Sequence, residues 1–262
     1  PAVLGAGADR LPLWAPLRSF GFGDEVVIRT AEFGLRGRSM RNVRQAVQRT
    51  RNAGVTTRIV REGDLAPDLR EALRRVAAHA LGGAAERGFS MNLDELLTGY
   101  HADALIAVAR DRAGEPVAFQ RYLISGSGLS LDAMRRAPGA PNGVNERLIV
   151  EVVGYARRHG VAEVSLNFAA FRELLESAER GLAERVGYRA LHLLDPWIAV
   201  ESLYLFDRKF RPAYRPRSIV FRSWWDIARL AAALLTLEFG RTRPAPAPEE
   251  PLPRAAGLPQ RP

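Results

Sequence analysis

The sequence contains no cysteine and little histidine, which excludes several kinds of chemistry at once. Without a thiol, the chain cannot form a disulfide, hold a metal through sulfur or use a cysteine nucleophile. No two histidines have the spacing of metal ligands on one helix, so we expect neither a metal site nor a cofactor. The four histidines are His79, His101, His159 and His192.

Long apolar runs are also missing. No stretch of about 18 consecutive apolar residues occurs, so we expect no transmembrane helix in this chain. No signal peptide and no Gly-x-Ser-x-Gly nucleophile elbow is present. The chain begins at Pro1 rather than at a methionine, so we expect it to be a fragment of a longer protein.

Basic residues are in excess, with 38 Lys and Arg against 29 Asp and Glu and a net charge of +9. This excess has two interpretations, which are simple solubility and binding to a polyanion such as nucleic acid or an anionic membrane surface. Six arginines gather around the helix expected over 39–52, off its apolar stripe of Met40, Val43, Val47 and Thr50. They form either a solvated face or a phosphate-contacting surface, and they are Arg36, Arg38, Arg41, Arg44, Arg49 and Arg51.

The order of the expected elements favours an α/β or α+β fold with a mixed sheet. A strand hairpin at 105–124 is followed by a strand at 129–131, a helix over 144–159 and a strand at 164–168. This order is seen in acetyltransferase-like folds, by analogy of fold alone. We also expect strands at 25–28 and 55–60, and helices over 68–81, 172–185 and 224–239.

The junction between the strand at 129–131 and the next helix gathers charges of both signs. Asp132, Arg135 and Arg136 precede a turn of Pro141, Asn142 and Gly143, and Glu146 lies just inside the helix. A helix start presents free backbone N–H groups to a ligand, so we expect a site for a charged substrate here. The turn has one glycine and a proline instead of a glycine-rich phosphate loop, which argues against coenzyme A.

A second basic segment, residues 204–217, reads YLFDRKFRPAYRPR and is expected to be irregular. It interleaves Phe206, Phe210 and Tyr214 with Lys209 and four arginines. Such a pattern suits a single-stranded RNA end, whose bases stack on aromatic rings. The alternative is a surface loop that proline stiffens. The four arginines are Arg208, Arg211, Arg215 and Arg217.

Several motifs, in order, resemble the catalytic domain of the aminoacyl-phosphatidylglycerol synthases, the multiple peptide resistance factor family. The resemblance is to the lysyl-phosphatidylglycerol synthase type and covers roughly residues 23–240. The matching motifs are GDEVVI (23–28), FGLRGRSMRNVRQAVQRTRNAG (33–54), RGFSM (87–91), GLSLDAMRRAPGAPNG (128–143), VSLNFAAFR (164–172), ESLYLFDRKFRPAYRPR (201–217) and LTLEF (235–239).

The resemblance implies a pair of acetyltransferase-like lobes with mixed sheets, the first of which is truncated. Residues 1–22 are then a poorly structured segment and 23–100 part of the first lobe. Residues 101–240 form the second lobe, and 241–262 are a disordered proline-rich tail.

The resemblance also implies transfer of an aminoacyl group, lysyl in the first instance, from aminoacyl-tRNA to phosphatidylglycerol. It places the domain at the cytoplasmic face of the membrane, with an upstream transmembrane domain in the parent chain. Without a nucleophile motif, direct attack by the lipid hydroxyl is the simpler route. Glu146 and Glu201 are then expected to hold the donor's amino groups, and Lys209 and Arg217 to contact phosphates or the developing oxyanion.

Asp132, Arg135, Arg136, Asn142 and Asn167 complete the expected substrate-binding set. Each has a plainer interpretation: Glu146 also suits the helix dipole, and Asn142 also suits a helix cap. Two other functions stay open, namely an acyltransferase of this fold with a different acceptor, and an RNA- or membrane-binding domain without catalysis.

Overall fold

The structure is a computed structural model that describes residues 2–81, 96–170 and 204–239. The strands are β1 (Ala2–Gly7), β2 (Arg18–Arg29), β3 (Thr56–Arg61), β4 (Leu105–Arg110), β5 (Pro116–Ser125), β6 (Gly128–Arg136), β7 (Glu163–Ala170) and β8 (Ala213–Phe221). The helices are α1 (Arg41–Asn52), α2 (Pro67–Leu81), α4 (Val144–Arg158) and α8 (Trp224–Phe239), with 3-10 turns η1 (Ala8–Trp14) and η2 (Glu62–Asp64).

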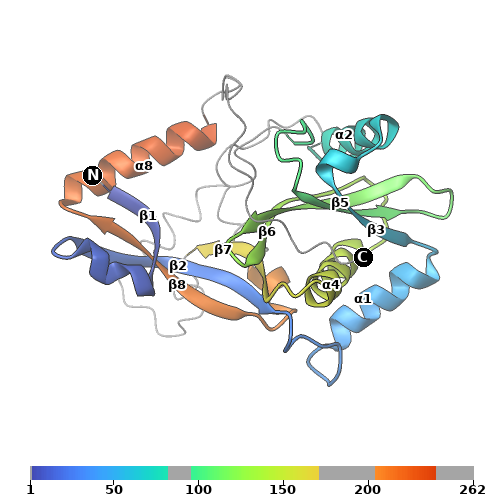
Figure 1. The fold of residues 1–262 in the computed structure, drawn as a ribbon, viewed down its shortest axis with the longest axis horizontal. Coiled ribbons are helices and arrows are strands. Elements are labelled where there is room, and N and C mark those ends of the chain that lie inside the picture. The colour runs from blue at the N-terminus through green and yellow to red at the C-terminus, as the bar shows by residue number, and fades with distance from the viewer. Residues whose placement is uncertain (1, 82–95, 171–203, 240–262) are drawn as a thin grey trace.

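All described strands join one sheet of eight, in the order β1-β8-β2-β7-β6-β5-β4-β3 (Figure 1). Neighbouring strands are antiparallel except for β6 and β7, which run parallel and are connected through α4. The sheet is therefore mixed, and the α/β prediction is confirmed. The hairpin of β4 and β5 and the strand–helix–strand unit of β6, α4 and β7 follow the predicted order.

Strand β7 joins the two halves of this sheet. It pairs with β2 from Gly23↔Ala170 to Arg29↔Glu163, but with β6 only from Gly128↔Glu163 to Ser130↔Ser165. Both strands continue beyond Ser130 and Ser165, so their shared hydrogen bonding ends well before either strand does. Asp132, Arg135 and Arg136 lie on the part of β6 that follows this separation.

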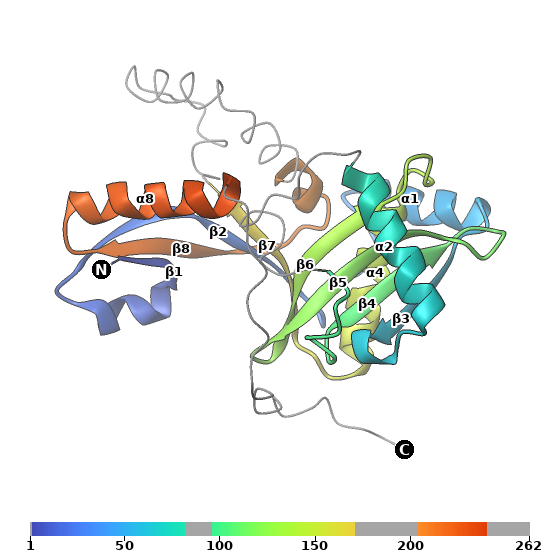
Figure 2. The same ribbon diagram turned by 90° about the horizontal axis from the view of Figure 1, so that it is seen from above.

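Helices cover both faces of the β3–β6 half of the sheet. Helices α1 and α4 pack together on one face, and α2 lies on the other, as Figure 2 shows from above. The four predicted inner residues of α1, at 40, 43, 47 and 50, are all buried. Helix α1 begins after Met40 without a side-chain cap, and the Ser39 hydroxyl accepts a hydrogen bond from Arg211.

Two segments are more regular than their sequences predict. Residues 2–22 form β1, η1 and the start of β2, although their Gly, Pro and Ala content gives no periodic signal. Most of 204–217, expected to be irregular, is a helical turn at 204–208 followed by β8. In both cases, backbone pairing with distant strands supplies the order: β8 pairs with β1 on one side and with β2 on the other.

The expected boundary near residue 100 falls inside the sheet, since β3 and β4 lie on either side of it and pair from Thr56↔Arg110 to Arg61↔Leu105. The division into lobes stays a prediction. The expected helix over 172–185 and the proline-rich tail lie outside the described residues. In the part of the chain that the structure describes, no helix has both the length and the hydropathy needed to cross a bilayer.

Candidate functional site

The turn before α4 is fixed by Gly143, which the sequence placed in the predicted site. Gly143 has a φ of 97° and serves as the N-cap of α4. A Cβ atom at this position would lie 2.8 Å from Ala46 Cβ and 2.9 Å from Ala46 Cα of α1. Only glycine satisfies both the left-handed backbone and this close approach. Gly143 therefore sets where the first turn of α4 lies against α1.

Replacing Gly143 by alanine is expected to lower the free energy of unfolding by roughly 2 kcal/mol or more, from backbone strain and from the clash with Ala46. Urea denaturation measures this change. Gly114→Ala is the matched control, because Gly114 has a φ of 86° but open space around its Cβ position. Equal losses in the two variants would show that the contact with α1 contributes nothing.

Glu146 and Lys209, which are far apart in the sequence, meet at the first turn of α4. The Lys209 Nζ donates a hydrogen bond to Glu146 Oε1 at 2.9 Å. The Glu146 side chain is 13% exposed and that of Lys209 is 38% exposed, so the pair sits at the protein surface with its acid turned inward. Lys209 also lies 4.9 Å from the centre of the Phe206 ring. The structure thus brings together two of the predicted catalytic residues.

Hydrogen bonds connect strand β5 with the start of α4. The Tyr122 hydroxyl donates to Gln120 Oε1 at 2.8 Å, and Gln120 Nε2 donates to the Asn145 carbonyl at 3.1 Å. Asn145 precedes Glu146, and Asp207 lies two residues before Lys209. Burial raises the pKa of Tyr122, and the nearby charge of Asp207 raises it further. We call Tyr122, Gln120, Asn145, Glu146, Lys209 and Asp207 the polar ring.

Asp207 is the residue of this ring that sequence reasoning missed. Its side chain is buried, and burial raises its pKa to about 8. A sequence signal did exist: Tyr204, Asp207 and Phe210 are spaced by three residues, which places them on one helical face, and both aromatic residues are buried. An acid on a buried face amid basic residues is unusual enough to be a site candidate.

The raised pKa of Asp207 predicts a pH-dependent stability. Because the unfolded chain loses this proton near its ordinary pKa of 3.8 and the folded chain near about 8, the group's contribution to stability falls as the pH rises between these values. Its limiting slope is about 1.4 kcal/mol per pH unit. Asp207→Asn should therefore match the wild type near pH 4 and become increasingly more stable up to about pH 8.

Urea unfolding at a series of pH values measures this difference. Asp103→Asn, which changes an exposed carboxylate, is the control and should show no such trend. A constant difference between Asp207→Asn and the wild type across this pH range would contradict a buried, neutral Asp207.

A pocket of about 470 Å³ adjoins the polar ring at Asn145. Arg135 and Arg136 at the end of β6 line it, together with His79 of α2. Arg135 is buried and Arg136 is exposed, so one guanidinium forms the wall and the other lies near the mouth. Two predicted substrate-binding residues thus share one pocket, whose charge suits an anionic group such as a phosphate.

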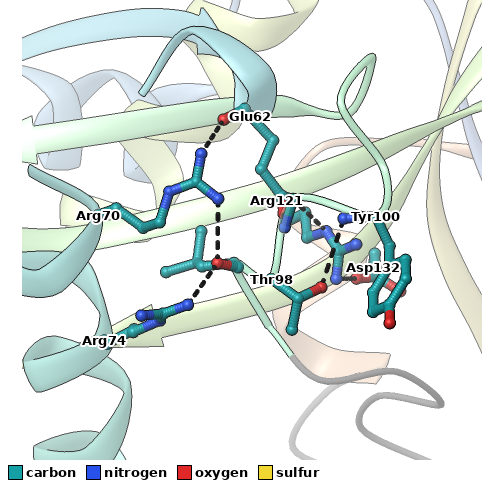
Figure 3. A network of polar contacts seen from close by, with 9 residues as sticks. Glu62, Arg70, Arg74, Thr98, Tyr100, Arg121 and Asp132 are labelled. Carbon is teal, nitrogen blue, oxygen red and sulfur yellow. Dashed lines mark hydrogen bonds and ion pairs between the residues drawn. The ribbon is translucent and has the colours of Figure 1, made fainter. Parts of the chain in front are cut away.

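Asp132, a third predicted substrate-binding residue, faces a buried arginine instead (Figure 3). Arg121 of β5 is fully buried and pairs with Asp132 Oδ2 at 3.3 Å and with Glu62 Oε2 at 3.0 Å. Glu62 is also fully buried and accepts a hydrogen bond from the Gly99 amide. Asp132 therefore helps to neutralise the charge of Arg121. No motif in the sequence indicates this pairing.

The remaining predicted residues lie elsewhere. Arg217 lies in β8, pairs with Glu25 and contacts the Gly5 carbonyl, so its partners are not those of Glu146 and Lys209. Asn142 is exposed, and no side chain caps α4. Asn167 has a φ of 82°, which asparagine tolerates better than most residues, and it lies on β7 beyond the pairing with β6. Glu201 lies outside the described residues.

No group of three metal-ligating side chains occurs within residues 2–81, 96–170 and 204–239.

Comparison with known proteins decides the family. Residues 1–221 match the family model described as "Phosphatidylglycerol lysyltransferase, C-terminal". The chain belongs to this family. The resemblance drawn from the motifs is confirmed, and the polar ring and the pocket lie within the matched region.

Two curated relatives of this chain come from mycobacteria. An MprF-like domain protein of Mycobacterium tuberculosis is 42% identical over 247 residues, which cover 90% of this chain and 51% of the relative. A lysylphosphatidylglycerol biosynthesis bifunctional protein of Mycobacterium avium is 36% identical over 245 residues, covering 91% and 21%. The chain thus spans about half the length of the first relative and about a fifth of the second.

The fold of this chain also has a solved counterpart. The structure of L-PGS from Bacillus licheniformis superposes with a TM-score of 0.76 and 21% identity, covering 92% of this chain and 74% of that one. At this identity the likeness establishes the shared fold.

Proposed function

We propose that this domain transfers a lysyl group from lysyl-tRNA to a hydroxyl of phosphatidylglycerol. The observation that carries the proposal is the Glu146–Lys209 pair at the start of α4, beside a pocket walled by Arg135 and Arg136. The donor amino acid requires an acid that binds its ammonium group. The two phosphate-bearing substrates require cations that bind their phosphates. Family membership and the names of the relatives support the same reaction.

The reaction exchanges one ester for another. The lipid hydroxyl oxygen attacks the carbonyl carbon of the lysyl ester, the bond from that carbon to the ribose oxygen breaks, and the hydroxyl proton ends on the released ribose oxygen. Glu146 holds the α-ammonium of the donor, which lies next to the reacting carbonyl. Lys209 is then placed beside the same group, where its charge offsets the developing oxyanion.

Arg135 and Arg136 bind a substrate phosphate in the pocket, so that the reacting hydroxyl and ester are held together. Asp132 acts through Arg121 by keeping the middle of β6 in place. We propose that two residues on neighbouring strands shape the site. They are Arg217, which pairs with Glu25, and Asn167, which lies where β6 separates from β7. Glu201 is proposed as a second acid for the donor.

The exposed arginines of α1 and of the segment before it provide a surface for the tRNA backbone. Arg36, Arg38, Arg41 and Arg49 are exposed, while the opposite face of α1 is buried against α4. Phosphate contacts of this kind give affinity without reading sequence. We propose that the domain acts at the cytoplasmic face of the membrane and that the parent chain has an upstream membrane domain.

The test is to incubate the domain with lysyl-tRNA, labelled in the lysyl group, and vesicles containing phosphatidylglycerol. Label should move into the lipid fraction, and ribonuclease added beforehand should prevent this. A labelled water-soluble acceptor in the absence of vesicles would instead favour an acyltransferase with another acceptor. No transfer from any charged tRNA to any anionic lipid, with tRNA binding intact, would leave a binding domain without catalysis.

A further inference from the structure

The end of the sheet at which β8 passes into α8 carries large apolar side chains that are open to solvent. At the start of α8, Trp225 is 81% exposed and Trp224 is 65% exposed. Phe20 of β2 and Leu13 and Trp14 of η1 are exposed as well. We call these five residues the apolar tip. Single exposed apolar side chains are common, but several gathered at one place mark a binding surface.

Backbone pairing brings the parts of the apolar tip together from both ends of the chain. On β2, Arg18 pairs with Phe221 and Phe20 pairs with Ile219, close to the point where β8 ends. The Trp224 ring lies 5.1 Å from the Phe221 ring, so the first turn of α8 packs against the same strand. Figure 2 shows η1 and α8 on opposite faces of this end of the sheet, with α1 at the other end of the molecule.

The charge beside the apolar tip is positive. Arg18 at the start of β2 and Arg222 at the end of β8 are both exposed. The acids of η1 and α8 are already matched: Asp9 pairs with Arg10 at 3.5 Å, and Asp226 accepts the amide of the residue before α8 at 3.0 Å. Two guanidinium groups therefore accompany the aromatic rings, and their charge complements an anionic surface.

We propose that the apolar tip binds the surface of a lipid bilayer that contains anionic lipid. Tryptophan is enriched where head groups meet acyl chains, and arginine beside it is attracted to the lipid phosphates. The apolar side chains come from both faces of one end of the sheet, which suits insertion into a fluid layer better than docking on one flat protein surface.

This inference goes beyond the proposed function, because it concerns a binding surface and needs neither tRNA nor lysyl transfer. Binding by the apolar tip also leaves the opposite end of the molecule in water, where the exposed arginines of α1 lie (Figure 2). The bilayer and a tRNA would therefore contact different ends of the protein.

The experiment measures binding of this chain to vesicles of mixed phosphatidylglycerol and phosphatidylcholine, without tRNA. Trp14, Trp224 and Trp225 are three of the four tryptophans of the chain, so tryptophan fluorescence reports on the apolar tip. The fourth, Trp197, lies outside the described residues and is the same in every variant. On binding, the emission should shift to shorter wavelength, and lipid brominated in its acyl chains should quench it. Sedimentation with the vesicles gives the affinity.

Two double variants test the apolar and the charged part separately. Trp225→Ser with Phe20→Ser should weaken binding on the order of 10- to 100-fold, because less apolar surface leaves water. Arg18→Gln with Arg222→Gln should weaken binding to the mixed vesicles roughly 10-fold and change binding to pure phosphatidylcholine little. Tyr100→Ser is the matched control, because Tyr100 is also an exposed aromatic residue but precedes β4, and it should bind like the wild type.

Three results would overturn the proposal. The first is equal vesicle binding by the wild type and by Trp225→Ser with Phe20→Ser, which would assign binding to another basic surface such as α1. The second is an emission shift that brominated lipid does not quench. The third is a wild-type dimer that ignores vesicles and dissociates in the same double variant, which would make the apolar tip a contact between two copies of the chain.

Discussion

Replacing Glu146 by glutamine is expected to lower the rate of lysyl transfer by at least about 100-fold and to leave the fold intact. Glutamine fills the same space but cannot form a charge-assisted hydrogen bond with an ammonium, and about 2.7 kcal/mol of lost transition-state binding corresponds to this factor. The same loss is expected for Lys209→Gln. Because the two side chains act as a pair at 2.9 Å, the double variant should be little worse than either single one.

The measurement is the initial rate of label transfer from lysyl-tRNA to phosphatidylglycerol vesicles, with thermal unfolding as the check on folding. Glu151→Gln is the matched control, because Glu151 lies on the same helix, is also paired with a basic residue, Arg147, and has no place in the polar ring. It should keep nearly full activity. A Glu146→Gln variant that retained activity within about threefold would remove Glu146 from the mechanism.

Replacing Arg121 by methionine is expected to lower the free energy of unfolding by about 3–5 kcal/mol, which for a chain of this size corresponds to a fall in melting temperature on the order of 10 °C. Methionine fills most of the volume but leaves the carboxylates of Glu62 and Asp132 without their shared cation. Glu62 has no exposed surface, so water cannot replace that cation. The loss reflects an uncompensated buried charge rather than lost packing.

Two further variants separate the effect of the uncompensated charge from the effect of lost packing. Adding Glu62→Gln and Asp132→Asn to Arg121→Met removes the stranded charges and should recover part of the stability. Arg29→Gln breaks an exposed ion pair with Glu32 and should change stability by no more than about 0.5 kcal/mol. If Arg121→Met unfolded at the same urea concentration as the wild type, the buried cluster would not stabilise this fold.

The elements with strong periodicity were predictable from the sequence, and the site followed from them in part. Helix α1 shows its buried stripe directly, and α4 follows a turn whose single glycine marks its start. The sequence alone indicates Glu146 and Lys209 as site residues, because each stands in a charged motif of the family. The contact itself depends on tertiary structure, which brings residues 63 positions apart together.

What the sequence could not predict depends on partners far away in the chain. Asp132 looks like a ligand-binding acid until Arg121 and Glu62 are seen beside it. Strand β8 contains Pro216, which disfavours a strand by local propensity, and it forms because β1 and β2 supply its hydrogen-bond partners. Gln120 is one more residue of a buried strand until its hydrogen bond to the Asn145 carbonyl of α4 is known.

The position of β8 between β1 and β2 also determines the order in which the protein can fold during synthesis. Strands β1 and β2 are synthesised before the other strands of this sheet, yet they do not pair with each other: β1 waits for residues 213–221, and β2 waits for β7 and then for β8. Throughout translation of the intervening chain, these strands have open edges of the kind that attracts other chains. The half-sheet of β3 to β6 has nearest neighbours close in sequence and can form earlier, so chaperones should bind nascent chains that have completed β6 but not β8.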